Sequence, residues 1–445
     1  MKIVVEKIKK AGLVPGFHIL YNNTSLNDEY VTPVPDNRLK LRRHFTLAAP
    51  LEKEDTTVYV AENPVGTTLK DNCRILKIGE ELVSYTNYSH SAPYRFTGCK
   101  RGVFNTESSG HASGYGIGLL DVFVVDEDVT PKFVTYNQDT DIQQEVARRL
   151  AGIYRDAGFR FLYYDGSEMT HSPSWFNCAK AQWEIYRQLD PEPVFAGGSA
   201  MSHFSWHMLT RGNHYDSHAW APEVMKVSIR KFPAAQAPRM AANFTASTFG
   251  RYKYFLPGKD TVGLQPDMIE YLASRAAAWG SPWILKARLE ELDAHPRTSD
   301  NLEVIKRWED AKARKWLTDE HRRMLKNLDQ EHILLVNESG EFELLEYERI
   351  DEVAGGSRDV RAFVFERKNE IYAVYWHVFQ DKRILMPVNR TNIELLVDLG
   401  HEAEVESGGE GDSVVLPVGP RRYVRTDKLT KDELVEAFQA AEILE

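Results

Sequence analysis

The sequence predicts an α/β protein: a (β/α)8 TIM-type barrel with a β-rich insertion and a C-terminal antiparallel β-sandwich. Residues 119–287 alternate apolar strand patterns with amphipathic helix patterns, which indicates parallel strands with helices outside them. Residues 33–118 and the residues from 331 onward show the period-two alternation of antiparallel strands instead. A doubly wound sheet is the competing interpretation. It is disfavoured because no GxGxxG or Walker pattern follows any strand.

Changes of pattern divide the 445 residues into five segments. Pro33 and Pro35 mark the first break. The predicted segments are the start of the barrel (1–32), an inserted β-rich domain (33–118), the continued barrel (119–330), the C-terminal β-sandwich (331–428) and a terminal helix (429–445). About seven strands precede residue 290, so we expect a barrel that lacks its first unit.

The chain begins with a helix pattern at residues 2–11, which runs through Gly12 into an apolar strand at residues 13–20. This abrupt start leads us to expect that the chain begins inside a domain. The first ten residues are too charged for the apolar region of a signal peptide. The sequence therefore assigns no compartment, and a periplasmic or extracellular location is expected only if the chain is part of a longer or processed protein.

The insertion is predicted from period-two strands, such as residues 57–60 and 74–86, with glycine turns between them. Cys73 and Cys99 flank one of its β-rich segments and could pair in an oxidising compartment. The pattern Ile78-Gly79-Glu80, Val83 to Thr86, Phe96 to Gly102 and His111 resembles a small β module of phage tail proteins and extracellular enzymes. We expect this insertion to shape one wall of a cleft.

The barrel elements follow in order from residue 119. A strand at 119–125 precedes a helix at 140–157, which Gly158 ends, and the central strand occupies 159–165. The further predictions are helices at 174–188, 201–212, 221–231, 266–279, 300–315 and 318–327, and strands at 192–197, 214–216, 239–245 and 283–286. The sandwich strands are predicted at 333–336, 342–345, 361–366 and 371–376, and a helix at 430–443.

Composition excludes several classes of partner. The formal net charge of -10 argues against nucleic acid, whose binding proteins carry a basic patch or stripe. No apolar run approaches the ~18 residues of a membrane span. The nine Trp and twenty Tyr include candidates for stacking on sugar rings, although most are expected in the core.

The candidate catalytic residue is Asp165, which closes the buried strand 159–165 and is followed by Gly166. A residue at the mouth of a sheet is held rigidly, as a nucleophile requires. The glycine allows a sharp turn and a close approach of substrate. Glycoside hydrolysis needs two carboxyl groups, about 5–5.5 Å apart for retention and about 6.5–9.5 Å apart for inversion.

An apolar strand that closes on aromatic-Asp-Gly, an α/β barrel and a following β-sandwich together resemble the retaining α-glycosidase barrels, such as α-L-fucosidases and α-galactosidases. Those enzymes place their nucleophilic aspartate at the end of the fourth strand, and residues 159–166 match that element. The segment 283–297, with 301–308 after it, resembles the barrel end of large bacterial polysaccharide-degrading glycosidases. The resemblance implies that Asp165 is the nucleophile.

The partner carboxyl group has several candidates. By strand order, the resemblance implies Asp216 as the acid/base, because the acid/base of these barrels often ends the sixth strand. Glu168 is its rival and lies only three residues from Asp165, where it could bind substrate hydroxyls or raise the pKa of a neighbour. Glu290 and Glu291 are weaker candidates, since they also fit a solvated helix start.

Residues at or near strand ends are candidates for substrate binding. They are His18, Tyr164, His203, Trp206, His207, Asn243, Trp279, Lys286 and Arg288. His203 and His207 stand four apart, a spacing that also ligates zinc on a helix, but no intervening Glu or third ligand accompanies them. We therefore expect no metal and no cofactor. Lys286 and Arg288 indicate an anionic substrate, such as a uronic acid or a sulfated sugar.

The leading hypothesis is a glycoside hydrolase that cleaves a poly- or oligosaccharide with retention, its partner being carbohydrate and neither nucleic acid nor a membrane. The alternative is a non-catalytic carbohydrate-binding or cell-surface protein with a degenerate barrel. The sequence contains no GxSxG nucleophile elbow, so it does not support serine-hydrolase chemistry.

Overall fold

The computed structural model describes residues 1–124, 132–166, 169–199, 201–213, 222–242, 246–403, 406–407 and 412–444. The chain divides into two compact units, Met1–Gly212 and Asn213–Glu445. Each unit has its own hydrophobic clusters and is described by itself. None of the helices in the described residues combines the length and the hydropathy of a membrane span.

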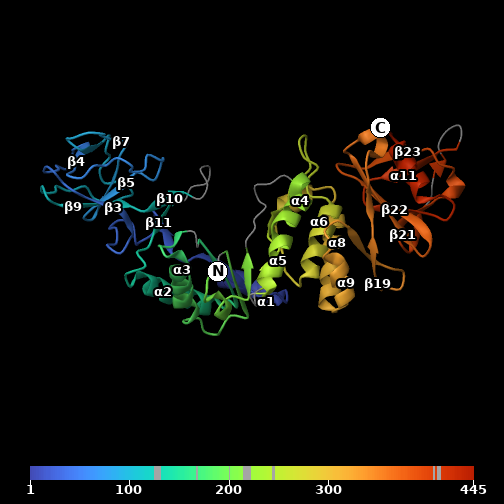
Figure 1. The fold of residues 1–445 in the computed structure, drawn as a ribbon, viewed down its shortest axis with the longest axis horizontal. Helices are drawn as coiled ribbons and strands as arrows, with labels where there is room; N and C mark the ends of the chain where they lie inside the picture. The colour runs from blue at the N-terminus through green and yellow to red at the C-terminus, as the bar shows by residue number, and fades with distance from the viewer. Residues whose placement is uncertain are drawn as a thin grey trace. The chain divides into compact units, whose positions relative to one another are not determined.

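A parallel sheet organises the first unit. Its strands are β1 (Gly16–Leu20), β12 (Phe161–Asp165), β13 (Phe195–Gly198) and β14 (Arg211–Asn213), and they pair in that order. Figure 1 labels helices α1 (Lys2–Lys10), α2 (Ile142–Ala157) and α3 (Ser174–Tyr186). These helices contribute side chains to a core shared with the sheet. The central strand, the helix before it and the helix after it are thus confirmed, as is Gly158, which ends α2 in the left-handed conformation.

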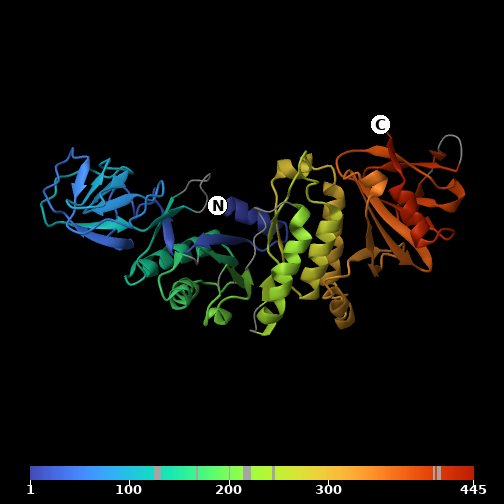
Figure 2. The same cartoon turned by 45° about the horizontal axis from the view of Figure 1, so that its top comes forward.

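The β-rich part of the first unit consists of short antiparallel strands, drawn mainly in blue in Figure 2. Its strands are β2 (Asn23–Ser25), β3 (Leu41–Thr46), β4 (Thr57–Tyr59), β5 (Ile75–Ile78), β6 (Glu81–Ser84), β7 (Asn87–Tyr88), β8 (Arg95–Thr97), β9 (Gly116–Leu120), β10 (Val122–Val124) and β11 (Lys132–Thr135). The predicted barrel strand at 119–125 is wrong, because β9 and β10 pair antiparallel with β3 and β5 and with β11. Cys73 and Cys99 are buried and form no disulfide with each other.

Glu81 explains part of the sequence pattern of the insertion. Its fully buried carboxylate accepts hydrogen bonds from the Arg101 guanidinium at 2.6 and 2.7 Å, and from the backbone N–H of Gly102 at 3.0 Å. Burial alone would raise the pKa of Glu81, but Arg101, the Ser109 N–H and His111 together lower it. These contacts hold the turn next to Glu81 against the turn at Arg101 and Gly102. This structural role explains the sequence pattern without a ligand.

The first part of the second unit is mainly helical. Its elements are η3 (Pro222–Val224), α4 (Met225–Lys231), α5 (Pro233–Ala242), β15 (Ala246–Thr248), β16 (Arg251–Lys253), α6 (Pro266–Ala278), β17 (Ile284–Lys286), α7 (Leu289–Ala294), α8 (Thr298–Ala313) and α9 (Asp319–Leu325). The buried helix α6 is surrounded by α4, α8 and α9. The predicted strand at 239–245 is wrong up to residue 242, which ends α5, and residues 243–245 lie outside the described residues.

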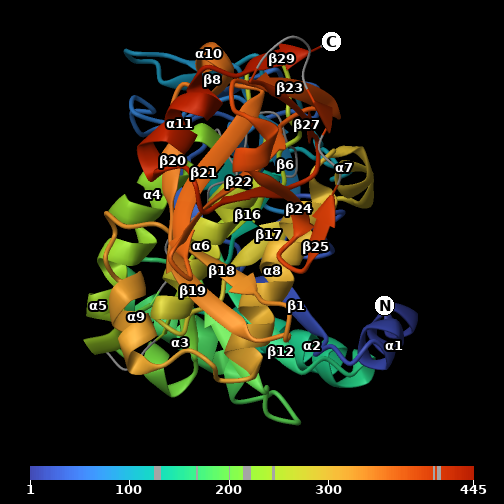
Figure 3. The same cartoon turned by 90° about the vertical axis from the view of Figure 1, so that its right-hand side faces the viewer.

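Two antiparallel sheets follow, visible with their orange and red strands in Figure 3. The six-stranded sheet contains β20 (Glu348–Ile350), β21 (Val360–Arg367), β22 (Glu370–His377), β28 (Arg422–Thr426), β24 (Glu394–Asp398) and β25 (His401–Ala403). The four-stranded sheet contains β26 (Glu406–Ser407), β27 (Val414–Val418), β23 (Lys382–Met386) and β29 (Glu442–Leu444). Their facing side chains form one core with α11 (Lys431–Gln439), the arrangement of a β-sandwich. The remaining elements are η2 (Ser205–His207), β18 (His332–Val336), β19 (Phe342–Glu346), α10 (Val353–Gly356) and η4 (Arg390–Asn392).

Among the described residues, neither unit contains the expected closed barrel. Within the described residues, the first unit contains the parallel sheet β1-β12-β13-β14, and the second contains the parallel pair β16-β17. The α/β class and the C-terminal antiparallel sheets are therefore confirmed. Closure into a barrel of eight strands stays a prediction.

Candidate active site

Asp165 lies at the carboxyl end of β12, next to the edge strand β1. The alternation of the strand places Leu162 and Tyr164 in the core and leaves Tyr163 and Asp165 partly exposed on the other face. Gly166 has a φ of 79°, and a Cβ there would come within 3.2 Å of Asn23 and Leu20 side-chain atoms. This turn therefore requires glycine.

His18 of β1 contacts the Asp165 carboxylate. Its Nε2 lies 2.9 Å from Asp165 Oδ2, and its ring meets Tyr163 edge-on at 5.4 Å between centroids. The contact follows from strand pairing, because His18 stands opposite Tyr163 and Leu20 opposite Asp165. Both side chains remain accessible, with exposed fractions of 50% for His18 and 30% for Asp165. The carboxylate is held in place but stays open to solvent.

The surroundings of Asp165 favour its charged form. Burial would raise the pKa of Asp165, but the hydrogen bond from His18, the Gly166 N–H at 2.9 Å and a hydrogen bond with Ser199 together lower it. Asp165 is therefore ionised at neutral pH. An ionised carboxylate can act as a nucleophile, a base or an electrostatic stabiliser, and it cannot serve as the proton donor.

Tyr164 is not at this site. Its side chain is fully buried, packs edge-on against Tyr21 at 5.7 Å, and belongs to the core between the sheet and its helices. Burial raises the pKa of Tyr164 well above its ordinary value. The neighbouring Tyr163 shares the face of Asp165 and replaces Tyr164 as the candidate for ligand contact.

Aromatic and imidazole rings gather on a second part of the first unit, which we call the aromatic surface: Trp175, Trp183, His203, Phe204, Trp206 and His207. The rings form a continuous series of contacts, from Trp175 to His203 at 4.7 Å and from His207 to Trp206 at 3.7 Å. Trp175 and Trp206 are 56% and 59% exposed, although tryptophan normally buries most of its surface. More than half of each tryptophan is therefore accessible to a ligand.

The expected helix at 201–212 is wrong, and with it the alignment of His203 and His207 on one helical face. The structure has only the 3-10 turn η2 at Ser205–His207, followed by β14. His203 packs against Trp175 and His207 against Trp206 and Phe204. Within the described part of the chain, no group of three or more His, Cys, Asp or Glu residues is arranged to hold a metal ion.

The other predicted residues are either in the second unit or outside the described residues. Glu168, Asp216 and Asn243 lie outside the described residues. Trp279 follows the last residue of α6 and packs beneath Lys326 at 4.1 Å, on the amino side of β17 rather than at its carboxyl end. Lys286 and Arg288 are exposed at the carboxyl end of β17. Glu290 is exposed in the first turn of α7, and the half-buried Glu291 accepts a hydrogen bond from the Arg288 backbone N–H at 2.9 Å, so both fit the expected helix start.

Sequence reasoning did not single out Tyr163, Ser199 or Trp175. For Tyr163 a signal existed, because period-two alternation assigns residues 163 and 165 to one face. Trp175 carried no comparable signal. The sequence does not show whether a tryptophan on a helix is exposed or buried.

No protein-family model matches the sequence, and no curated protein matches it. Solved structures similar to this chain include a GH27 β-L-arabinopyranosidase from Geobacillus stearothermophilus, with 10% identity, 67% of this chain and 65% of that chain covered, and a TM-score of 0.30. An isomaltulose synthase from Klebsiella sp. LX3 has 10% identity, coverage of 96% and 85%, and a TM-score of 0.36. An α-amylase from H. orenii has 12% identity, coverage of 96% and 83%, and a TM-score of 0.35. The arabinopyranosidase and the α-amylase are glycoside hydrolases.

Proposed function

We propose that this protein is a glycoside hydrolase that acts on a poly- or oligosaccharide, with Asp165 as the nucleophile of a retaining mechanism. The observation that carries the proposal is the setting of Asp165: an ionised carboxylate at the carboxyl end of a parallel strand, oriented by His18 and left accessible. Ligands of parallel α/β sheets bind at this end of the strands.

In this mechanism an Asp165 oxygen attacks the anomeric carbon and forms a glycosyl-enzyme ester. The glycosidic C–O bond breaks, and the leaving oxygen takes a proton from the second carboxyl group, for which Asp216 and Glu168 remain the candidates. That group then removes a proton from water, and the hydroxide releases the sugar from Asp165. His18 acts as a positioning residue, because its contact is with Asp165.

The aromatic surface supports a saccharide ligand. Sugar rings present patches of C–H groups that pack on the faces of aromatic rings, while imidazole nitrogens bond to hydroxyl groups. Trp175, Trp206 and His203 offer both kinds of contact from one part of the first unit. The same observation favours a second candidate function, a non-catalytic carbohydrate-binding protein.

The experiment starts from a panel of chromogenic glycosides and polysaccharides, with products read by chromatography. On any substrate that is cleaved, Asp165→Asn should reduce kcat at least 10³-fold, an order-of-magnitude expectation for loss of a covalent nucleophile. Asp156→Asn is the matched control, since Asp156 is an exposed aspartate on α2 of the same unit. Near-normal activity of Asp165→Asn would refute the assignment.

Azide separates the roles of the carboxyl groups. In Asp165→Gly, azide can take the place of the missing nucleophile and should restore turnover, giving a glycosyl azide of inverted configuration. Asp216→Gly and Glu168→Gly are tested in the same way. Azide should restore turnover only in the variant that lacks the acid/base, and its glycosyl azide should have retained configuration. If the wild-type protein binds saccharides from the panel and releases no product, the binding function is correct instead.

A further inference from the structure

The parallel pair β16-β17 in the second unit carries an unusual concentration of positive charge on one face. The strands pair with Arg251 opposite Ile284, Tyr252 opposite Leu285 and Lys253 opposite Lys286. Tyr252 is buried and Leu285 packs against the same core. The alternation of a strand then puts Arg251, Lys253, Ile284 and Lys286 on the opposite face.

Lys253 and Lys286 stand directly opposite each other at the carboxyl ends of the two strands. Neighbouring strands are about 4.8 Å apart, so the two lysine side chains leave the backbone close to each other and on the same face. Like charges in directly opposite positions destabilise a sheet. The backbone makes this pairing obligatory, because Tyr254 N–H continues the ladder by donating to Lys286 C=O at 2.9 Å.

Carboxylates of the described residues do not neutralise these lysines. No ion pair within the described residues involves Lys253, Lys286 or Arg288, although Asp and Glu outnumber Lys and Arg, 65 to 55, in the chain. Lys253 is half-buried with its ammonium 5.1 Å from the Phe255 ring centroid, and Lys286 is exposed. Arg288 lies two residues after Lys286 in extended backbone, and its side chain is exposed.

We infer that Lys253 and Lys286, with Arg288 beside them, bind the anionic group of an acidic saccharide, either a uronate carboxylate or a sulfate ester. An anion between the two ammonium groups removes their repulsion and gains charge-assisted hydrogen bonds. Its position at the carboxyl ends of parallel strands is where α/β sheets bind ligands. The inference rests on the proposed function for the saccharide class and names the charge of the substrate.

The test measures binding to the full chain by titration calorimetry, with Asp165→Asn used so that turnover does not interfere. The probes are an oligogalacturonide, a sulfated dextran oligosaccharide, a neutral maltooligosaccharide and poly-L-glutamate. We expect one of the two acidic saccharides to bind, and which of them binds distinguishes the carboxylate from the sulfate. Lys253→Met and Lys286→Met should each weaken that binding about tenfold, as expected for loss of a contact to a charged group.

Lys259→Met is the matched control, because Lys259 is an exposed lysine in the turn after β16. It should leave the affinity unchanged. Urea unfolding supplies an independent readout: Lys286→Met should be at least as stable as the parent protein, because it removes a repulsive pair. A merely structural lysine would lower the midpoint instead.

Three results would overturn the inference: equal affinity for the neutral saccharide, equal affinity for poly-L-glutamate, or unchanged affinity in the Lys253→Met, Lys286→Met double variant. The experiment also distinguishes failure of the proposed function from failure of this inference. Acidic saccharides that bind to this face but are never cleaved by the wild-type protein leave the inference standing. Cleavage of neutral saccharides without binding of acidic ones removes the inference and leaves the hydrolase.

Discussion

Asp165 and its neighbours show how hydrogen bonds set the charge of a carboxyl group at the end of a strand. The strand end alone would give Asp165 a partly buried carboxyl group with a raised pKa, which is suited to an acid. The His18 contact and the Gly166 N–H reverse that direction. The neighbours of Asp165 therefore decide which half of the proposed chemistry it performs.

The pKa of Asp165 should rise when His18 is replaced. In the wild-type protein the pKa of Asp165 should lie below the ordinary aspartate range. The carboxylate therefore stays charged at neutral pH and becomes protonated only when the pH falls below that range. His18→Ala removes the largest contact that lowers the pKa, while burial still raises it. Carboxyl ¹³C NMR of labelled protein measures both values without a substrate.

His44→Ala serves as the control for that titration, because His44 is an exposed histidine in the same unit. It should leave the Asp165 curve in place. An Asp165 titration that is the same in the His18→Ala protein would show that the contact does not set the charge. The acidic limb of the pH–rate profile should shift upward together with the NMR value.

At the scale of elements, Asp267 connects three parts of the second unit. Its fully buried carboxylate lies in α6 and accepts from Lys226 of α4 at 2.9 Å and from Arg361 of β21 at 2.7 Å. Burial would raise the pKa of Asp267, but Arg361 and Lys226 together lower it. Both cations are mostly buried, and Lys226 also pairs with Glu331 at 2.6 Å, so Arg361 depends on this carboxylate more than Lys226 does.

Asp267→Asn should destabilise the second unit by about 3–5 kcal/mol, the usual cost of removing one partner of a buried ion pair. The amide leaves the Lys226 and Arg361 charges without their shared counter-charge. Urea unfolding followed by tryptophan fluorescence measures the change. Asp260→Asn, at an exposed turn, should leave the midpoint unchanged. A loss below about 1 kcal/mol would indicate that water or Glu331 replaces the carboxylate.

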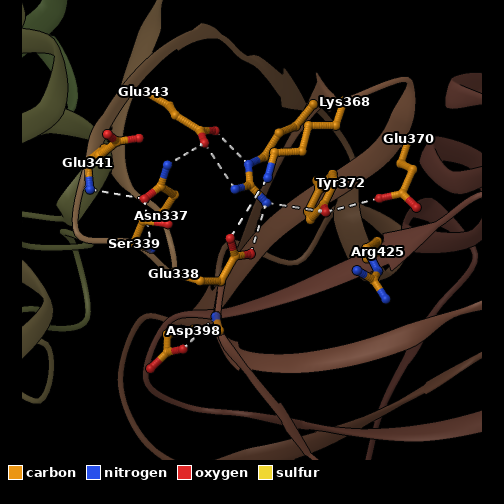
Figure 4. A network of polar contacts seen from close by, with 12 residues as sticks. Asn337, Glu338, Ser339, Glu341, Glu343, Lys368, Glu370, Tyr372, Asp398 and Arg425 are labelled. Carbon is orange, nitrogen blue, oxygen red and sulfur yellow. Dashed lines mark hydrogen bonds and ion pairs between the residues drawn. The ribbon is translucent and has the colours of Figure 1, made fainter.

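A second network ties the hairpin β18-β19 to the six-stranded sheet (Figure 4). Arg367 of β21 is 3% exposed, and its guanidinium donates to Glu343 of β19 at 2.6 and 3.1 Å. Glu338 lies 3.6 Å from the same guanidinium, and the Tyr372 hydroxyl lies 3.4 Å from it. The Arg367 hydrogen bonds lower the pKa of Glu343.

Glu343→Gln should cost about 3 kcal/mol, because the bidentate pair is lost and Arg367 is nearly buried. Glu341→Gln is the matched control from the same hairpin, since the Glu341 side chain is exposed and Glu341 contacts Asn337 through its backbone N–H. Amide hydrogen exchange should show the protection of β18-β19 falling in Glu343→Gln. Unchanged exchange in that hairpin would contradict the role assigned to the network.

At the scale of the whole molecule, the charges predict a loss of stability in acid. Most described carboxyl groups with a resolved shift have lowered pKa values in the folded state, so they stabilise the fold above the ordinary carboxyl range and lose that contribution as pH falls. They include Asp36, Glu81, Asp165, Asp267 and Glu343. Glu270 and Asp300 act in the opposite direction, since burial raises their pKa values.

The midpoint of urea unfolding should therefore fall as the pH is lowered through and below about 4, where aspartate and glutamate ordinarily titrate. Unfolding followed at several pH values between neutral and acid measures this slope. A midpoint that stays constant or rises toward acid would mean that Glu270 and Asp300 outweigh the other carboxyl groups.

Prediction from sequence succeeded where a pattern is local. The helices around 142–157, 174–186 and 266–278 and the strands around 161–165 and 195–198 follow from periodicity and from stop signals such as Gly158. It failed at residues 201–212 and 239–242. There, short apolar runs fit either a helix or a strand, and packing made the choice. It also failed at 119–125, since periodicity identifies a strand but not the direction of its neighbours.

By itself the sequence determined the α/β class, the change to antiparallel strands after residue 331 and the position of Asp165 at the end of a buried strand, because each depends on neighbouring residues along the chain. Tertiary structure alone decided that His18 contacts Asp165, that Tyr164 faces the core and that Lys253 stands opposite Lys286. Strand register brings these side chains together across as many as 147 residues. No local pattern encodes which residues of two separate strands will stand opposite each other.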